Sequence, residues 1–277
     1  MGTILANNKL KKLRPPWKQI GGKYYLSQWI ISNMPAHKGY HEACGGAGSV
    51  ILNKELATVF NVYNELNPNT CGIMLALKYK STEFIDILKS LTYSEETFNE
   101  AKLTINNYPD FSLEKACREF VIRRMSRSGL GKDFGWSNRT RGGIPGDINA
   151  WNTIIEQLPL ISAKLSKIEI VNKDCFITLN DYDDVETLHY IDCPYVKDTR
   201  NTKDLYKTFD WNDELHIKLC KVAKSLKGKV MISGYDNKIY NELLSNFIVK
   251  KKQIANHAGQ TEVKNTRVEC IWMNYEL

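Results

Sequence analysis

Short apolar runs and longer amphipathic stretches alternate along the chain. Apolar runs typical of buried strands cover residues 58–63, 168–171, 187–191 and 229–233, and the last two runs, 248–256 and 267–274, predict an antiparallel hairpin. Apolar residues at a spacing of three to four predict helices over residues 71–80, 82–91, 94–106, 113–125, 213–226 and 236–245. The pattern indicates a mixed α/β protein.

The predicted strands fall into two groups, one on each side of a helical block. Residues 1–67 and 167–277 are therefore expected to form one discontinuous α/β domain, and residues 68–166 a helical insert. A chain of 277 residues with 43% hydrophobic residues can bury a full core in this arrangement.

The positive charge of the chain predicts an anionic partner. The formal net charge is +7, and the basic residues gather in the insert together with aromatic residues and glycines. Arg118 and Arg123 are expected to pair with Glu114 and Glu119 on a helix surface. The glycine-rich part that follows is typical of a surface that grips DNA phosphates. The candidate DNA-binding residues are Arg124, Arg127, Ser128, Lys132, Trp136, Arg139 and Arg141.

Cysteine usage and the apolar pattern indicate the compartment. The seven cysteines include no Cys-x-x-Cys pair, which argues against a disulfide framework and a zinc site, so no metal is predicted. The basic start of the chain differs from a signal sequence, and no apolar run approaches membrane-spanning length. The expected location is the cytoplasm.

The segment Tyr190-Ile191-Asp192-Cys193-Pro194-Tyr195 carries the most specific chemistry. The exocyclic amino group of a nucleobase is a poor nucleophile, because its lone pair is delocalised into the ring. A carboxylate and a backbone carbonyl that accept both N–H hydrogens would redirect that lone pair towards an electrophilic methyl group. Asp192 and the carbonyl of Cys193 are the candidates, Pro194 fixes the backbone, and Tyr195 would stack on a base turned out of its duplex. A simple strand-ending turn is the alternative interpretation.

A glycine-rich loop lies far upstream of this segment. Glu42 and Cys44 lead into Gly45, Gly46 and Gly48, in a predicted order of strand, glycine turn and helix. Such a turn lets the backbone approach a nucleotide-like ligand closely.

Two charged residues flank the glycine loop in sequence. Glu65 follows the strand over 58–63, where its carboxylate would accept hydrogen bonds from ribose hydroxyls or cap the next helix. Lys23 ends a Gly-Gly-Lys turn that suits a ligand carboxylate.

Along the chain, these segments follow the order Gly-Gly-Lys turn, glycine loop, Glu65, insert and Asp192 segment. In this order they resemble the Dam-like family of DNA adenine methyltransferases from about Pro15 to Asn274. The resemblance implies a Rossmann-like methyltransferase fold with a mostly parallel twisted sheet, a C-terminal antiparallel hairpin and a DNA-recognition insert. It also implies transfer of a methyl group from S-adenosyl-L-methionine to the N6 amino group of a flipped adenine in double-stranded DNA.

Carried over by position, the resemblance assigns a set of cofactor contacts. Lys23 and the glycine loop would hold the methionine end, Glu65 the ribose, and Asp174 with Cys175 the adenine. Gln19 stands where the family often has Trp, and Trp17 lies two places earlier. The candidate cofactor contacts are Trp17, Gln19, Lys23, Glu42, Cys44, Gly45, Gly46, Gly48, Glu65, Asp174, Cys175 and Asp192.

The resemblance also bears on the target and the setting. Cys193 stands where the family usually has Pro, and only its carbonyl is needed. Arg127 and Ser128 replace the aromatic residue and Asn of the family's loop that enters the duplex, so the recognised sequence does not transfer. We expect a monomer in a bacterial cell or phage-infected host, and a cognate restriction endonuclease is a candidate partner.

Four alternatives stay open at this point. Two retain the fold: a DNA cytosine-N4 methyltransferase and a catalytically inactive DNA-binding protein. The third is an enzyme in which Cys193 attacks C5 of cytosine. The fourth is a nicotinamide oxidoreductase, supported only by the glycine loop and Glu65.

Overall fold

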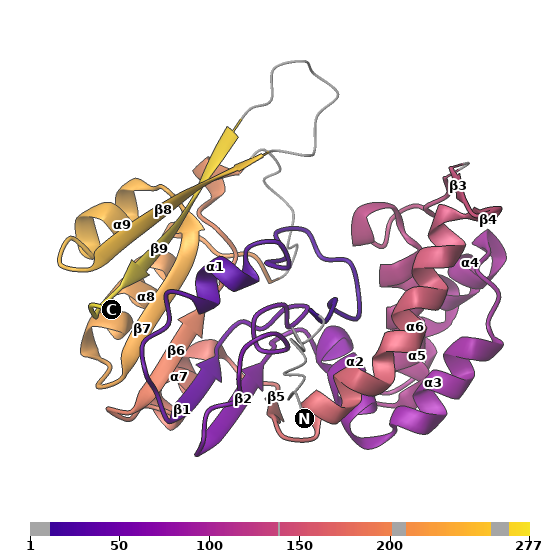
Figure 1. The fold of residues 1–277 in the computed structure, drawn as a ribbon, viewed down its shortest axis with the longest axis horizontal. Coiled ribbons are helices and arrows are strands. Elements are labelled where there is room, and N and C mark those ends of the chain that lie inside the picture. Colours follow the sequence, from indigo (N-terminus) through magenta and orange to yellow (C-terminus); the bar gives the residue numbers. More distant parts are fainter. Residues whose placement is uncertain (1–11, 138, 201–208, 256–265) are drawn as a thin grey trace, which may run out of the picture.

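The computed structural model describes residues 12–137, 139–200, 209–255 and 266–277. Within these ranges, a seven-stranded sheet has the order β5-β2-β1-β6-β7-β9-β8 (Figure 1). The strands are β1 Gly39–Glu42, β2 Phe60–Asn64, β5 Glu169–Val171, β6 Thr187–Ile191, β7 Lys229–Tyr235, β8 Ile248–Ala255 and β9 Thr266–Met273.

The sheet is parallel except at one end. Strands β5, β2, β1, β6 and β7 pair in parallel, whereas β9 runs antiparallel to both β7 and β8. This confirms the predicted α/β fold with its C-terminal antiparallel hairpin. The loop predicted to join the last two strands lies outside the described residues.

Two apolar clusters cover the two faces of the sheet. Side chains alternate between them along each strand, so Tyr190 belongs to one cluster and Ile191 to the other. Helices α7 Cys175–Asp181, α8 Asp213–Ser225 and α9 Lys238–Leu243 pack on the second face. Every residue of β6 is buried, because a central parallel strand is covered on both sides.

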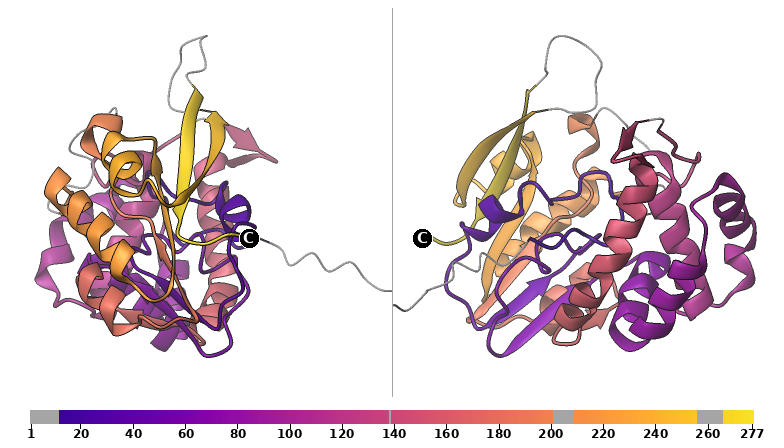
Figure 2. Two further views of the ribbon diagram at one scale, coloured as in Figure 1. Left: turned by 90° about the vertical axis from the view of Figure 1, so that its left-hand side faces the viewer. Right: turned by 45° about the vertical axis from the view of Figure 1, so that its right-hand side comes forward.

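The first face meets the helical part of the chain. Four helices, α3 to α6, gather beside the sheet, and α2 lies between them and the strands (Figures 1 and 2). These elements are α2 Pro68–Tyr79, α3 Ser81–Ser90, α4 Glu95–Thr104, α5 Leu113–Met125 and α6 Gly146–Leu165, with the 3-10 turns η1 Ile105–Asn107 and η2 Arg127–Gly129 and the short strands β3 Thr140–Arg141 and β4 Ile144–Pro145.

Local signals explain where these helices begin. The side chains of Asn67, Ser94 and Ser112 accept hydrogen bonds from the first turns of α2, α4 and α5. Helix α5 spans the predicted residues. Helix α6 lies within the block expected to be helical but is not among the individual helices predicted; it begins without a side-chain cap and contains Pro159.

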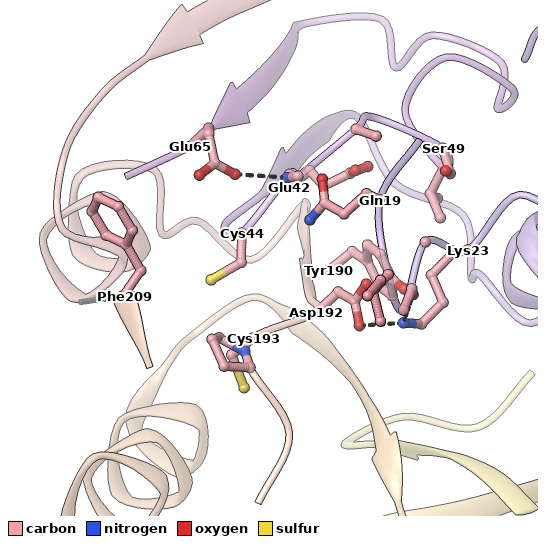
Figure 3. A pocket seen from close by; sticks show the side chains of 18 residues that line it. Gln19, Lys23, Glu42, Cys44, Ser49, Glu65, Tyr190, Asp192, Cys193 and Phe209 are labelled. Atoms are coloured by element: carbon pink, nitrogen blue, oxygen red, sulfur yellow. Dashed lines mark hydrogen bonds and ion pairs between the residues drawn. The ribbon is translucent and has the colours of Figure 1, made fainter. Parts of the chain in front are cut away.

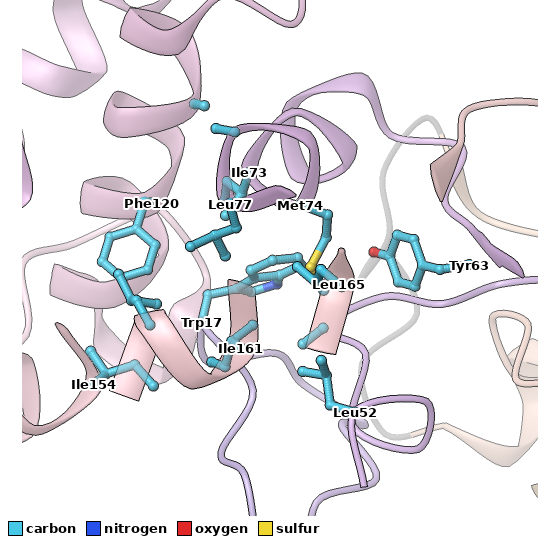
Figure 4. Packing of buried hydrophobic residues seen from close by; sticks show 14 of the residues in the cluster. Trp17, Leu52, Tyr63, Ile73, Met74, Leu77, Phe120, Ile154, Ile161 and Leu165 are labelled. Carbon is cyan, nitrogen blue, oxygen red and sulfur yellow. The ribbon is translucent and has the colours of Figure 1, made fainter. Parts of the chain in front are cut away.

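One side chain joins the N-terminal segment to the helices. The indole of Trp17 is fully buried among Ile73, Met74, Ile161 and Leu165, which come from α2 and α6 (Figure 4). The same apolar cluster reaches Tyr40 and Tyr63 on the sheet. The sheet and the helices therefore share one continuous core.

The helix expected after the glycine loop does not form. Residues 49–54 adopt a series of turns instead. The side-chain amide of Asn53 donates to the carbonyls of Ser49 and Leu13, and its oxygen accepts the N–H of Leu13. These bonds tie the turns to the N-terminal segment. The two remaining described elements are α1 Ser27–Ile31 and η3 Lys197–Thr199.

Candidate active site

A pocket opens where β1, β2 and β6 end (Figure 3). The carboxyl ends of parallel strands meet at one edge of a sheet, which is where α/β proteins bind ligands. The pocket holds about 670 Å³ of space including its mouth. Its lining includes Gln19, Lys23, Glu42, Cys44, Gly45, Gly46, Ser49, Glu65, Tyr190, Asp192, Cys193, Pro194 and Phe209.

The glycine loop needs its glycines for two different reasons. Gly46 and Gly48 have φ values of +50° and +69°, which other residues adopt only with strain. A Cβ atom on Gly45 would lie 2.2 Å from the ring of Tyr63, and one on Gly46 would lie 2.6 Å from Nε2 of Gln19. The loop backbone therefore forms a cradle that a larger residue would fill.

Glu65 holds this cradle in place. Its Oε2 accepts the N–H of Gly46 at 2.8 Å, and its Oε1 accepts the N–H of Asn67 at 3.0 Å. Burial raises the pKa of its carboxyl group. The side-chain cap of α2 is Asn67 rather than Glu65. Each oxygen of Glu65 keeps a lone pair for a ligand hydroxyl.

Glu42 places a second carboxyl group in the pocket. It is 2% exposed, and its Oε2 accepts the hydroxyl of Tyr40 at 2.8 Å. Burial is the main cause that raises its pKa to about 8, and nearby Asp192 adds to the shift. A cationic group bound in the pocket would favour the ionised carboxylate.

Asp192 uses one of its two oxygens to fix its position. Its Oδ1 accepts the hydroxyl of Ser233 at 2.8 Å and lies 2.8 Å from Nζ of Lys23. The hydroxyl of Tyr190 lies 3.1 Å from that of Ser233 and supports it from behind. Among the described residues, Oδ2 makes no further hydrogen bond. One carboxylate oxygen thus stays available in the pocket.

The Cys193 thiol points into the second apolar cluster. Its Sγ lies 3.4 Å from the hydroxyl of Tyr240, whose oxygen lies 2.9 Å from Nδ1 of His216. Burial raises the pKa of the thiol, so it stays protonated near neutral pH. This environment does not suit a thiolate nucleophile, and it argues against attack on cytosine C5.

Tyr195 is packed more tightly than the sequence suggests. It is 8% exposed and does not line the pocket. Nζ of Lys23 lies 4.7 Å from the ring centroid, and Tyr235 contacts the ring edge-on at 4.8 Å. The hydroxyl donates a short hydrogen bond to Oε1 of Glu269.

Four predicted cofactor contacts lie away from the pocket lining, and one of them is Gly48, which shapes the glycine loop through its positive φ. Trp17 is buried in the shared core, where its Nε1 donates to Oε1 of Gln19 at 3.2 Å. Asp174 caps α7 by accepting the N–H of Phe176, and Cys175 is 6% exposed within the second apolar cluster. The burial of Trp17 contradicts its assignment as a cofactor contact, and its indole serves packing instead. Gln19, in contrast, does line the pocket.

The predicted DNA-binding residues divide into two groups. Arg124 is half-buried between α5 and α6, where it donates to the carbonyl of Ala150 at 3.0 Å and burial lowers its pKa to about 10. This corrects its assignment to the DNA surface. The residues that are exposed are Arg127, Ser128, Lys132, Trp136 and Arg139. For Arg141 only the backbone is described, in β3.

The Arg127–Ser128 turn lies against the segment that carries Gln19 and Lys23. Gly129 has φ +73°, and a Cβ there would lie 2.1 Å from the carbonyl oxygen of Lys18. The exposed turn is therefore held beside the pocket. Farther along α5, Arg123 pairs with Glu119 at 2.7 Å as predicted, whereas Arg118 donates to Thr104 and Tyr108.

The sequence interpretation missed four residues of the site. Ser49 and Phe209 line the pocket, and Ser233 and Glu269 contact its functional side chains. Ser49 directly follows the last loop glycine, and Glu269 is a charged residue within an apolar strand, so the sequence contained a sign that each has a function. The sequence around Phe209 contains no such sign.

Two wider searches of the described ranges are negative. They contain no group of three or more His, Cys, Asp or Glu side chains placed to hold a metal ion. No helix in these ranges is both long enough and apolar enough to cross a membrane.

Comparison with known proteins identifies the family. No curated protein matches the chain. The family model for D12 class N6 adenine-specific DNA methyltransferases matches residues 20–257, which include the glycine loop, the insert and the Asp192 segment. The chain therefore belongs to the D12 class N6 adenine-specific DNA methyltransferase family, and it methylates the N6 amino group of adenine in DNA.

Proposed function

We propose that the methyl donor is S-adenosyl-L-methionine and that Asp192 and the Cys193 carbonyl direct the adenine amino group towards it. The observation that carries this proposal is the state of Asp192. Lys23 and Ser233 both engage Oδ1, which leaves Oδ2 as an acceptor in the pocket. A fixed acceptor needs little rearrangement when a substrate arrives.

The pocket fits the proposed donor by its charges and polar groups. Glu42 suits the ammonium group, and Glu65 suits the ribose hydroxyls. The hydroxyl of Ser49 is buried and has no hydrogen-bond partner among the described residues, so it suits the ligand carboxylate. When bound, S-adenosyl-L-methionine supplies a methyl group on a positively charged sulfonium.

The amino group reacts only if its lone pair leaves the ring system. Asp192 Oδ2 would accept one N6 hydrogen and the Cys193 carbonyl the other, which favours a pyramidal nitrogen. Asp192 also suits the proton that N6 must lose after it gains a methyl group. Tyr195 would meet the face of the flipped base, once Lys23 shifts from its ring.

We propose that exposed residues of the insert bind the duplex. Arg127, Lys132, Arg139 and Arg141 would contact phosphates, while Ser128 and Trp136 would approach the bases. The β3–β4 ribbon lies on the same side of the molecule as the last residue of β8, Ala255, and the first residue of β9, Thr266 (Figures 1 and 2). A duplex across that side would contact both.

The setting of the enzyme is also proposed. We expect a monomer that acts in the cytoplasm of a bacterial cell or phage-infected host, with a cognate restriction endonuclease as candidate partner. Light scattering after size-exclusion chromatography measures the oligomeric state directly.

Mass spectrometry of nucleosides tests the reaction and the role of Asp192 together. Unmethylated DNA incubated with the protein and S-adenosyl-L-methionine should yield N6-methyladenine. Asp192→Asn should lower turnover a hundredfold or more, because the amide cannot accept in the same way, while DNA affinity changes little.

Asp198→Asn is the control, since Asp198 is an exposed carboxylate six residues farther along. Its turnover should match the wild type. Methylated cytosine as the only product would contradict adenine specificity. Full turnover by Asp192→Asn would remove Asp192 from the mechanism.

A further inference from the structure

Glu269 is a buried carboxylate with no role in the mechanism above. It lies on β9 and is 2% exposed, and its neighbours Cys270, Ile271 and Trp272 are fully buried apolar residues. Placing a carboxylate in such surroundings costs free energy unless it is paired. Burial does raise the pKa of Glu269, which reflects this cost.

The antiparallel direction of β9 places Glu269 beside the pocket. Strand β9 is antiparallel to β7, so its first residues lie at the edge where the parallel strands end. Glu269 pairs in register with Tyr235, two residues beyond Ser233 on β7. Glu269 and Ser233 therefore point to the same face and the same edge of the sheet.

Its contacts are with two residues of the proposed mechanism. Oε1 of Glu269 accepts the short hydrogen bond from the Tyr195 hydroxyl. The same oxygen lies 3.8 Å from Nζ of Lys23, and that ammonium group lies 2.8 Å from Oδ1 of Asp192. Two carboxylates therefore share one cation, and one of them also holds the aromatic ring.

These contacts constrain the two groups that a target base would meet. A phenol ring can tilt about its side-chain bonds, and a hydrogen bond at its far end restricts that tilt. Nζ of Lys23 lies closer to Asp192, at 2.8 Å, than to Glu269, at 3.8 Å, so the second carboxylate takes only part of the attraction of this cation. Loss of the Glu269 charge would strengthen the pull of Lys23 on Asp192 and weaken that carboxylate as an acceptor for the adenine amino group.

We propose that Glu269 is a positioning residue for adenine methylation, which fixes the Tyr195 ring and serves as the alternative counterion for Lys23. It touches neither the base nor the donor. The inference rests on the proposed roles of Asp192 and Tyr195. It adds a residue from the antiparallel end of the sheet to a site otherwise built from the parallel strands.

A double-mutant cycle with Glu269→Gln and Tyr195→Phe tests the proposal. Tyr195→Phe removes one hydroxyl and keeps the stacking ring, so folding is preserved even if Glu269→Gln proves unstable. Each variant should lower kcat on DNA about tenfold or more, because small misplacements of reacting groups are costly. The donor Kd and the thermal midpoint of Tyr195→Phe should stay close to those of the wild type. The double variant should be no worse than Glu269→Gln alone, since Tyr195→Phe acts only through the hydrogen bond to Glu269, whereas Glu269→Gln changes both that bond and the Lys23 contact.

Glu169 and Tyr182 provide a matched control pair. The hydroxyl of Tyr182 donates to Oε1 of Glu169 at 2.8 Å at an exposed position away from the pocket. Glu169→Gln and Tyr182→Phe should leave kcat unchanged. Normal kcat in Tyr195→Phe, or independent effects that multiply in the double variant, would overturn the proposal. If the wild type itself forms no N6-methyladenine with S-adenosyl-L-methionine, the proposed mechanism fails, which is a separate result.

Discussion

Individual charged residues determine which ligand charge the pocket favours. Glu42, Glu65 and Asp192 line the pocket. Glu269 adds a fourth carboxyl group beside it, and Lys23 contacts Asp192 and Glu269. A site with more carboxyl groups than cationic side chains favours a cationic ligand, and both the sulfonium and the ammonium of the proposed donor are cationic. Burial is the main cause that raises the pKa of Glu42 to about 8, and the neighbouring carboxylate of Asp192 adds to it.

A pair of buried histidines carries a prediction about pH. His41 on β1 and His189 on β6 are both fully buried, with their Nδ1 atoms 3.1 Å apart. Burial lowers their pKa values from 6.5 to about 3 and about 4. The unfolded chain therefore binds protons more readily. The free energy of unfolding should be highest above pH 6.5 and fall as the pH drops towards 4, by up to about 1.4 kcal/mol per pH unit for each histidine.

Urea unfolding at several pH values checks this expectation. The double variant His41→Leu, His189→Leu should have a shallower dependence on pH between 4 and 6.5 than the wild type. Carboxylates that titrate in the same range remain in both proteins, so the difference in slope isolates the histidines. Equal slopes would show that the pair does not govern acid stability.

The elements differ in how far the sequence predicts them. Helix α5 is predicted at both ends, because Ser112 caps it and its apolar spacing is regular. Helix α6 is not among the helices predicted, although Ile154, Leu158 and Ile161 recur along it at a spacing of three to four. The missing side-chain cap and Pro159, which lies inside the helix, weakened its other local signals.

The exposed end of the insert carries a prediction about salt. Arg127, Lys132 and Arg139 lie on the turn after α5 and on the approach to β3, and all three are exposed. If each meets a phosphate, the triple alanine variant should reduce the slope of log affinity against log salt by about 0.9 per contact, roughly 2.7 in all. DNA binding measured at a series of salt concentrations gives this slope.

Lys89→Ala is the control for the loss of a positive charge outside the proposed DNA surface. Lys89 is exposed in the last turn of α3, far from the β3–β4 ribbon (Figure 1). Its loss should leave the slope unchanged. An unchanged slope in the triple variant would instead move the DNA surface away from this part of the insert.

The stability of the whole molecule depends on the core around Trp17. This indole contacts apolar residues of α2 and α6 and belongs to the cluster that reaches the sheet. Trp17→Ala should lower the free energy of unfolding by about 3–5 kcal/mol, because it leaves a large cavity. Circular dichroism during urea unfolding measures the change.

Trp136→Ala is the control for Trp17→Ala, because it removes an indole that is not fully buried. Trp136 is 48% exposed, so its replacement should cost about 1 kcal/mol or less. A similarly small effect for Trp17→Ala would contradict the role assigned to the shared core.

The order of motifs made most of the pocket predictable from the sequence. The glycine loop, Glu65 and Asp192 follow the ends of neighbouring parallel strands, and topology brings such ends together, whereas Lys23 was assigned from the Gly-Gly-Lys turn. Ser233 and Glu269 were not predictable in this way, since their part in the site depends on the register of β7 and β9 with β6. Trp17 was assigned by position alone, and its burial could be known only from the packing.

The continuous core limits how new sequence specificity can be engineered. Exchanging the entire block of helices with that of a relative would replace the residues of α2 and α6 that surround the Trp17 indole, while the indole itself stayed on the N-terminal segment. Smaller grafts at the outer turn and ribbon, residues 127–145, would leave that packing intact. Altered specificity should therefore be sought through the tip of the block, with its supporting helices retained.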